Sequence, residues 1–304
     1  MGNSLNYIEE NKTIKDHSSC VFSLLLLKDG RIASCSNDNT IRIYDPKSKY
    51  HCDLAFKGNS GPVYSMCQLD NGDLVTGFYN GTIKIWTINE ETCEWKFTIN
   101  NAHASLVSKV VALSNNRFAS CGGDCNIKIW NGSEPSQVPI KVLEGHHSNL
   151  RSILRMNDKD ILISISEGRG LRVWNLRTYE CISSELNNTK CYDANSLYQI
   201  DDDRVIVGSD NGASIINITN TEVEYQIKNG EGKDFYNVSS FVKLNNDHIF
   251  CGCGNGKYCL IDTNKMQYTI QESTHKEGFT DLLKVDNYTF LSSSFDNTIK
   301  IWKY

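Results

Sequence analysis

The sequence contains no long hydrophobic run and no cluster of positive charge. None of its apolar segments approaches 18 residues, the length at which a run becomes a candidate membrane span. The N-terminus lacks the basic-then-apolar pattern of a secretory signal. With 31 Lys and Arg against 36 Asp and Glu, the net charge is −5. Because nucleic-acid binding depends on a basic surface, we expect no nucleic-acid partner. The absence of a long apolar run likewise predicts that no segment spans a membrane.

The motifs that often mark an active site are also missing. The sequence has no G-x4-G-K-[ST] phosphate loop, no H-E-x-x-H motif and no G-x-S-x-G elbow. The acidic residues Asp201, Asp202 and Asp203 could hold calcium, but they stand where other parts of the chain have polar turns before a β-rich run. A solvated turn is the favoured interpretation, since a calcium loop needs further spaced oxygen ligands. We therefore expect no cofactor.

A repeat of nearly constant length fills the chain. Segments of the form T-I-K-I-W recur at steps of 41 to 44 residues and end at Tyr44, Trp86, Trp130, Trp174, Asn217, Ile261 and Trp302. A second β-rich run precedes each, separated from it by Asn, Asp or Gly residues that supply the positive φ angles of hairpin turns. Further apolar runs lie ahead of each hairpin and behind it, such as residues 21–27 and 52–56. Seven units of four strands are predicted, at a period typical of propeller blades.

The repeat resembles that of the WD-repeat β-propeller family over essentially the whole chain. Blades of that family carry a His before the first strand, a Ser or Thr in the second, an Asp in the next turn and a Trp closing the third. Three units keep this tetrad with at most one substitution: His17, Ser34, Asp38 and Tyr44; His103, Ser120, Asp124 and Trp130; His275, Ser292, Asp296 and Trp302. The resemblance implies an all-β, seven-bladed propeller of four-stranded antiparallel blades, in which each tetrad is a hydrogen-bond relay.

The remaining units depart from this tetrad. The fourth has Gly168 where the Asp belongs, and the second has Asn59 and Asn80 in place of His and Asp. The fifth and sixth have neither the Trp nor the His. We therefore expect blades five and six to be the least regular of the ring.

The two ends of the chain predict how the ring closes. The last unit stops after its third strand, whereas residues 5–14 form a strand without a hairpin. The resemblance implies that this N-terminal strand completes blade seven. Residues 1–304 would then be a single propeller domain, with blades at about 17–57, 59–100, 103–144, 146–187, 191–228, 234–272 and 275–304.

The 12 cysteines predict free thiols rather than a disulfide framework. The chain shows no secretion signal, which favours a reducing compartment, and we expect a cytoplasmic protein, with the nucleus as the alternative. Cys35 and Cys121 share a repeat slot with Gly77 and Gly208, so this slot requires a small residue. Zinc is disfavoured because the sequence has no C-x-x-C pair, and we predict no metal site.

The recurring His, Ser and Asp could also be interpreted as a catalytic triad. An active site needs one such set in one pocket, whereas this chain has the set at the same offsets in three units. The structural role is therefore favoured, and no catalytic residue is predicted.

Partner-binding positions follow from the resemblance. Relatives usually bind proteins on the face that carries the turns between second and third strands and the starts of the first strands. Alignment places Phe22, Tyr64, Tyr79, Leu106 and Phe295 there, together with Arg151 and Asp210. Aromatic side chains outside the core are typical interaction hot spots, although some of these rings could instead pack on neighbouring loops. We predict that an apolar peptide or partner loop docks over blades seven, one and two, with Arg151 and Asp210 on its polar rim.

The expected function is a non-catalytic scaffold or adaptor, a monomeric propeller that binds other proteins or peptides within a multiprotein complex. A receptor for phosphopeptides or substrates in a larger complex is an alternative, but it would need several converging arginines, and only Arg151 aligns there. An enzyme that uses the central channel is a second alternative because fold does not decide function.

Overall fold

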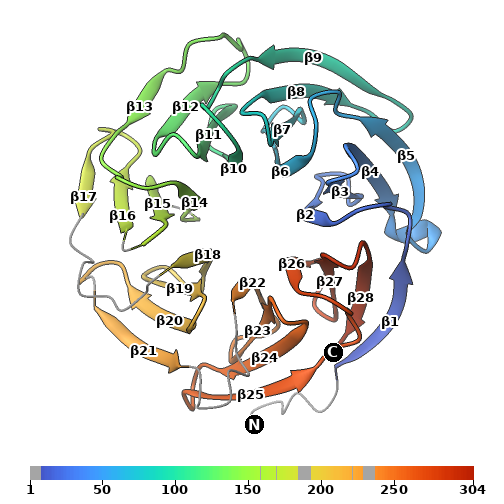
Figure 1. Cartoon of the computed structure of the whole chain (residues 1–304), viewed down its shortest axis with the longest axis vertical. Helices are drawn as coiled ribbons and strands as arrows, with labels where there is room; N and C mark the ends of the chain where they lie inside the picture. Colours follow the sequence, from blue (N-terminus) through green and yellow to red (C-terminus); the bar gives the residue numbers. More distant parts are fainter. Residues whose placement is uncertain (1–7, 158, 169, 184–192, 221, 229–236) are drawn as a thin grey trace.

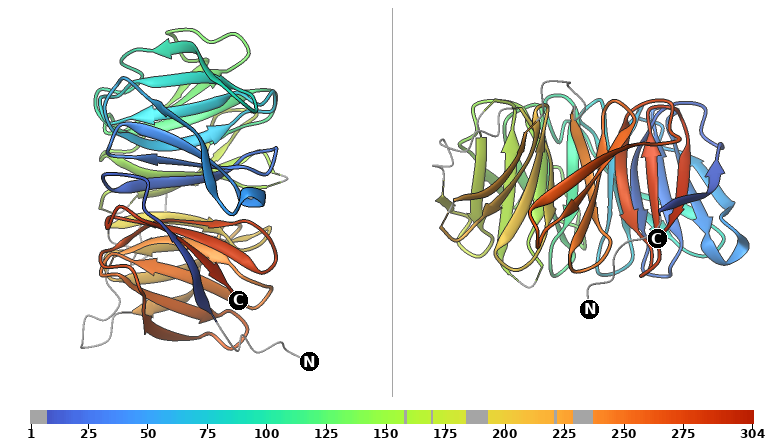
Figure 2. Two further views of the ribbon diagram at one scale, coloured as in Figure 1. Left: turned by 90° about the vertical axis from the view of Figure 1, so that its right-hand side faces the viewer. Right: turned by 90° about the horizontal axis from the view of Figure 1, so that it is seen from below.

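Seven antiparallel sheets of four strands each stand around a central channel in the computed structural model (Figure 1). The structure describes residues 8–157, 159–168, 170–183, 193–220, 222–228 and 237–304. Seen from the side, the strands run between the two faces of a disc (Figure 2). The predicted all-β, seven-bladed propeller is confirmed.

The blades share one strand order, from the channel outward. Blade one contains β2 (Val21–Leu26), β3 (Ile32–Ser36), β4 (Thr40–Asp45), the short 3-10 helix η1 (Pro46–Ser48) and β5 (His51–Lys57). Blade two contains β6 (Val63–Gln68), β7 (Leu74–Phe78), β8 (Ile83–Ile88) and β9 (Cys93–Ile99). Blade three contains β10 (Val107–Ala112), β11 (Arg117–Gly122), β12 (Ile127–Asn131) and β13 (Lys141–Leu143). Blade four contains β14 (Leu150–Arg155), β15 (Ile161–Ser166), β16 (Gly170–Asn175) and β17 (Cys181–Ser183).

The last three blades repeat this arrangement. Blade five contains β18 (Ala194–Gln199), β19 (Arg204–Ser209), β20 (Gly212–Asn217) and β21 (Val223–Lys228). Blade six contains β22 (Val238–Lys243), β23 (His248–Cys253), β24 (Lys257–Asp262) and β25 (Gln267–Glu272). Blade seven contains β26 (Phe279–Lys284), β27 (Thr289–Ser294), β28 (Ile299–Lys303) and β1 (Glu9–Ile14).

The N-terminal strand closes the ring as predicted. β1 pairs antiparallel with β28, and Ile14 lies opposite Ile299. The ammonium of Lys300 donates a hydrogen bond of 2.8 Å to the carboxylate of Glu10. The first and last strands of the chain thus share one sheet (Figure 1). Of the predicted closing strand and blade limits, residues 5–7, 184–187, 191–192 and 234–236 lie outside the described part of the chain.

The repeat marker of blade five is Ile216 and not Asn217, which corrects the alignment by one residue. Ile216 is fully buried and pairs with Val205, as Trp86 pairs with Leu74 in blade two. The reason is the turn between β19 and β20. Ser209 pairs directly with Gly212, so this turn has two residues, whereas three residues separate Phe78 from Thr82 in blade two.

Blades five and six form complete four-stranded sheets, so their expected irregularity is wrong for the strand pairing. Cross-strand backbone bonds and apolar packing hold these sheets without the Trp and His of the tetrad. Three-residue outer strands lie instead in blade four, as β17, and in blade three, as β13. Pro135 and Pro139 precede it, and proline cannot donate a backbone hydrogen bond to a sheet.

The hydrophobic core lies in the seams between neighbouring blades. One core cluster, for example, joins Ile41 and Ile43 of blade one to Met66 and Phe78 of blade two. The predicted small-residue slot faces such a seam, because a Cβ on Gly77 would lie 2.6 Å from the side chain of Val107. Cys35 and Cys121 fill the same slot, and the cysteines within the described residues are free thiols.

Candidate docking face at the mouth of the channel

The tetrads of blades three and seven form continuous relays of hydrogen bonds. In blade three, Trp130 Nε1 donates to Ser120 Oγ at 2.8 Å, and Ser120 Oγ lies 2.7 Å from His103 Nε2. His103 Nδ1 is 2.6 Å from Asp124. Because the serine oxygen already accepts the indole N–H, its own proton can go to Nε2, which leaves Nδ1–H to donate to the carboxylate. In blade seven the matching distances are 2.7, 2.7 and 2.9 Å, through Ser292, His275 and Asp296.

The other tetrads show what each substitution changes. In blade one, His17 contacts Ser34 at 2.6 Å and Asp38 at 2.8 Å, but the hydroxyl of Tyr44 is buried and has no hydrogen-bond partner. In blade four, Ser166 Oγ takes the place of the Asp and lies 3.0 Å from His146 Nδ1. Burial, assisted by the charge of Arg172, lowers the pKa of His146 to about 4.

The electrostatics of the relays suit a structural role. Burial acts to raise the pKa of Asp38, Asp124 and Asp296. Hydrogen bonds from the paired histidines and from other neighbours, such as Thr40, Lys128 and Thr298, together outweigh burial and hold each pKa well below its usual range. Each set is confined to its own blade, and none of its histidines is among the described residues that line the central channel. The three sets therefore do not converge on a single cavity.

A β-bulge at the start of every innermost strand shapes the mouth of the channel. The pairing of β2 with β3 skips one residue between Val21 and Ser23, and the same shift recurs in all seven blades. A bulged residue has no partner on the neighbouring strand, and the bulge changes the direction of its side chain. The seven bulge residues all line one cavity of about 520 Å³ and are Phe22, Tyr64, Ser108, Arg151, Asn195, Ser239 and Thr280.

Four of the predicted partner-binding residues form an aromatic ladder, defined as Phe295, Phe22, Tyr64 and Tyr79. Phe22 and Tyr64 are stacked with ring centroids 4.2 Å apart. Phe295 meets Phe22 edge-on at 6.3 Å, and Tyr79 stacks on Tyr64 at 5.9 Å. The side chains at both ends are exposed, Phe295 by 41% and Tyr79 by 58%. The ladder crosses blades seven, one and two.

The three remaining predicted residues do not join the ladder. Leu106 and Arg151 line the same cavity, and Arg151 pairs with Glu167 of its own blade at 2.7 Å. Asp210 is set back from the cavity wall and accepts a hydrogen bond of 2.7 Å from Asn195. The polar side of the mouth is therefore largely paired internally.

Sequence reasoning missed two charged residues of the channel wall, Lys109 and Asp281. Each directly follows a bulge residue, at a position where the other five blades carry Ser. A comparison of the seven units at this position would have singled them out, because the other five units all have serine there.

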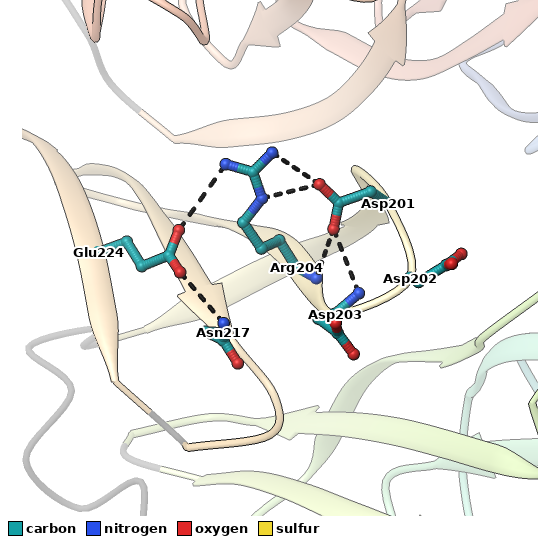
Figure 3. Close-up of a pocket in the computed structure, with 6 residues that line it drawn as sticks. All are labelled: Asp201, Asp202, Asp203, Arg204, Asn217 and Glu224. Atoms are coloured by element: carbon teal, nitrogen blue, oxygen red, sulfur yellow. Dashed lines mark hydrogen bonds and ion pairs between the residues drawn. The ribbon is translucent and has the colours of Figure 1, made fainter.

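The acidic residues Asp201, Asp202 and Asp203 belong to a turn closed by ion pairs (Figure 3). Asp201 accepts from Arg204 Nη2 at 2.6 Å and from the Arg204 backbone N–H at 2.9 Å. Asp203 pairs with Lys159 at 2.8 Å. These contacts favour the solvated turn over a calcium loop. Within the described residues, no group of three or more His, Cys, Asp or Glu is placed to hold a metal ion.

Comparison with known proteins places this architecture in a family. The family model described as "WD domain, G-beta repeat" matches residues 8–45, 50–87, 92–131 and 265–303. The chain belongs to the WD40 repeat family. WD40 propellers are typically protein-interaction scaffolds and are generally non-catalytic. Among the residues that the structure describes, no helix is long and apolar enough to cross a bilayer.

Individual relatives of this WD40 propeller are distant in sequence. An uncharacterized WD repeat-containing protein of Schizosaccharomyces pombe is 22% identical over 90% of this chain and 74% of its own length. Ribosome biogenesis protein YTM1 of Meyerozyma guilliermondii is 21% identical over 84% of this chain. The chain spans 65% of YTM1 and no more than a quarter of several other relatives.

A solved structure shows the same fold. The crystal structure of the WD40 beta propeller domain of Doa1 superimposes with a TM-score of 0.80 and covers 98% of both chains, at 15% sequence identity.

Proposed function

We propose that this WD40 propeller is a non-catalytic interaction module, and that its aromatic ladder binds an apolar segment of a partner protein. The observation that carries the proposal is the ladder itself, four aromatic rings in contact across three blades with both ends exposed. Ring pairs of this kind bury large areas at low cost in side-chain entropy. Occupation by an apolar peptide would remove this surface from water.

The ladder is dispensable for the core, which supports a binding role. The buried clusters between the blades contain none of its four rings. The aromatic residues sit on bulges and turns instead, at positions where other blades carry polar or charged residues or Gly. Side chains that do not pack in the core are available to bind a partner.

A non-catalytic role is supported by where the chemistry-bearing groups lie. The histidines of the relays are buried against their own Ser and Asp partners. The carboxylate of Asp281 in the channel accepts hydrogen bonds from Ser23 and from the Leu24 N–H. These groups are committed to holding strands together.

A phosphopeptide receptor is less well supported. Recognition of a phosphate by arginine needs an unpaired guanidinium, and the guanidinium of Arg151 is already paired with Glu167. We further propose that the propeller acts as a single copy within a larger complex, in line with relatives named for ribosome biogenesis or as a probable coatomer subunit.

The proposal is tested by recovering partners with a tagged propeller. Phe22→Asp combined with Tyr64→Asp places two charges in the ladder, and we expect partner proteins recovered by the wild type to be lost. Tyr288→Asp is the matched control, because Tyr288 is 70% exposed and lies in the loop between β26 and β27, on the opposite face. Equal recovery by the folded double variant and the wild type would reject the ladder as the binding surface.

A further inference from the structure

Among the described residues, one charged side chain on the wall of the channel has neither an ion pair nor a hydrogen bond with another described residue. The residue after each bulge is a serine in five blades, namely Ser23, Ser65, Ser152, Ser196 and Ser240. All of these serines except Ser65 line the cavity. Blade seven has Asp281 at this position, and blade three has Lys109. The two charged residues are in very different situations.

Asp281 is fully engaged in joining blade seven to blade one. Its carboxylate accepts a hydrogen bond of 3.0 Å from Ser23 Oγ and one of 2.9 Å from the Leu24 backbone N–H. Its role is to link two innermost strands, β26 and β2. Nothing in this arrangement requires a ligand.

Lys109 has no such partner. Its ammonium forms no ion pair and no hydrogen bond with any described residue, although the side chain is half-buried and lines the 520 Å³ cavity. Three buried thiols lie near its charge, but burial raises the pKa of Cys67 and of Cys121 to about 12 and that of Cys35 still further. The thiols therefore stay protonated and cannot serve as counter-ions.

Lys109 lines the same cavity as Phe22, Tyr64 and Phe295 of the aromatic ladder. The backbone N–H of Val110, the next residue, donates a hydrogen bond of 3.1 Å to Ser65 Oγ. Ser65 directly follows Tyr64, whose ring is part of the ladder. A peptide lying on Tyr64 would therefore pass the wall that carries Lys109.

A half-buried cation without a partner costs folding free energy, and a serine fills this position in five other blades. A charge kept at such a position is available to an anion from outside. A carboxylate matches the single charge of one lysine, whereas a phosphate dianion would call for more cations, and the nearby Arg151 is already paired.

We propose that Lys109 binds the carboxylate of an Asp or Glu side chain in the same peptide that docks on the aromatic ladder. The partner segment is thus apolar and acidic, with the acid entering the channel between blades two and three. The inference rests on the proposed function and adds the charge that selects the partner.

The test uses random 12-residue peptides displayed on phage and selected on the full propeller. We expect the selected peptides to pair an apolar residue with an Asp or Glu at a constant spacing. A selected peptide is then synthesised with its acid or with the matching amide, and binding is measured by fluorescence anisotropy. Lys109→Met and Lys109→Ser should each weaken the acidic peptide about tenfold, the loss expected of one charge-assisted hydrogen bond. The amide peptide should bind the wild type and both variants equally.

Controls separate this inference from the proposed function. Lys109→Ser restores the residue found in most blades, and a melting temperature at or above that of the wild type shows that it folds. Lys109→Arg should retain binding of the acidic peptide. Peptides that need Phe22 and Tyr64 but show no acidic preference would overturn the lysine site and leave the ladder in place. Peptides indifferent to all three residues would overturn both. Stabilisation of the wild type, but not of Lys109→Met, by inorganic phosphate without any acidic preference would show a small-anion site and overturn the peptide assignment.

Discussion

Each relay ties the turn between two strands to the loop that precedes the blade, and Trp130 begins the relay of blade three. Its ring is buried against Phe118, with centroids 6.2 Å apart, and its N–H is used by Ser120. Packing therefore contributes more than the hydrogen bond to the stability that Trp130 gives the fold.

Truncation of this ring is the first prediction at the residue scale. Trp130→Ala should lower the free energy of unfolding by about 3–5 kcal/mol, as expected when a large buried side chain is removed. Trp130→Phe keeps most of the packing but deprives Ser120 of a donor, so we expect a loss of about 1–3 kcal/mol. Urea unfolding followed by circular dichroism measures both. An unchanged midpoint for Trp130→Ala would contradict the assignment.

The histidines predict how stability depends on pH. His146 titrates at a pKa of about 4 in the folded protein and near 6.5 in an unfolded chain. The unfolded state thus binds more protons between these values. The stabilising contribution of neutral His146 to the free energy of unfolding is fully present above about pH 6.5. It is lost as the pH drops towards 4, which lowers the free energy of unfolding by up to about 3 kcal/mol. His103 and His275, whose pKa burial also lowers, act in the same direction.

His146→Gln is the matched variant for this prediction. It removes one titrating group while Ser164 and Ser166 can still be hydrogen-bonded. Melting temperatures measured from pH 7.5 to pH 4.5 should fall less steeply for the variant than for the wild type. Parallel curves would show that His146 does not titrate with folding.

At the scale of elements, ring closure depends on β1. This strand covers the hydrogen-bonding edge of β28, and Ile14 is buried beside Ile299. An uncovered edge strand offers a template for pairing with another chain. The ion pair between Glu10 and Lys300 adds to this contact. Burial acts to raise the pKa of Glu10, but hydrogen bonds, first of all that from Lys300, outweigh it and lower the pKa to about 2.

Deletion of residues 1–14 should therefore produce oligomers or aggregates. Size-exclusion chromatography with light scattering reports this directly, and deletion of residues 1–7, which leaves β1 intact, serves as the control. A monomer with the melting temperature of the full chain would show that β1 is not needed for closure.

The sequence predicted the blades and relays because they recur at one spacing, and Trp130 or His275 can be aligned with its counterparts by counting. It misplaced the marker of blade five, because a two-residue turn after Ser209 shortens that hairpin while the loop beyond it restores the total length. Alignment of the seven units could not reveal the bulges, because every unit has one and the repeat spacing is therefore unchanged. The partner-less state of Lys109 follows from three-dimensional contacts and has no signal within a single repeat.

At the scale of the whole molecule, the two sides of one mouth of the channel differ in chemistry. Bulges and turns collect Phe295, Phe22, Tyr64 and Tyr79 on one side of one mouth, while blades four and five present paired polar groups there. A ring closed through β1 holds these blades in fixed relation. The ladder is therefore preformed, which lowers the entropy cost of binding.

The central claim is that partners dock on this one face, and hydrogen–deuterium exchange of the propeller with a recovered partner tests it most directly. We predict that binding slows exchange in the segments that form the mouth, residues 19–24, 62–66, 78–81 and 294–297. The outer strands β5, β9 and β25 should exchange at their free rates. Protection confined to those outer strands, or to the loops of the opposite face around Tyr288, would contradict the account.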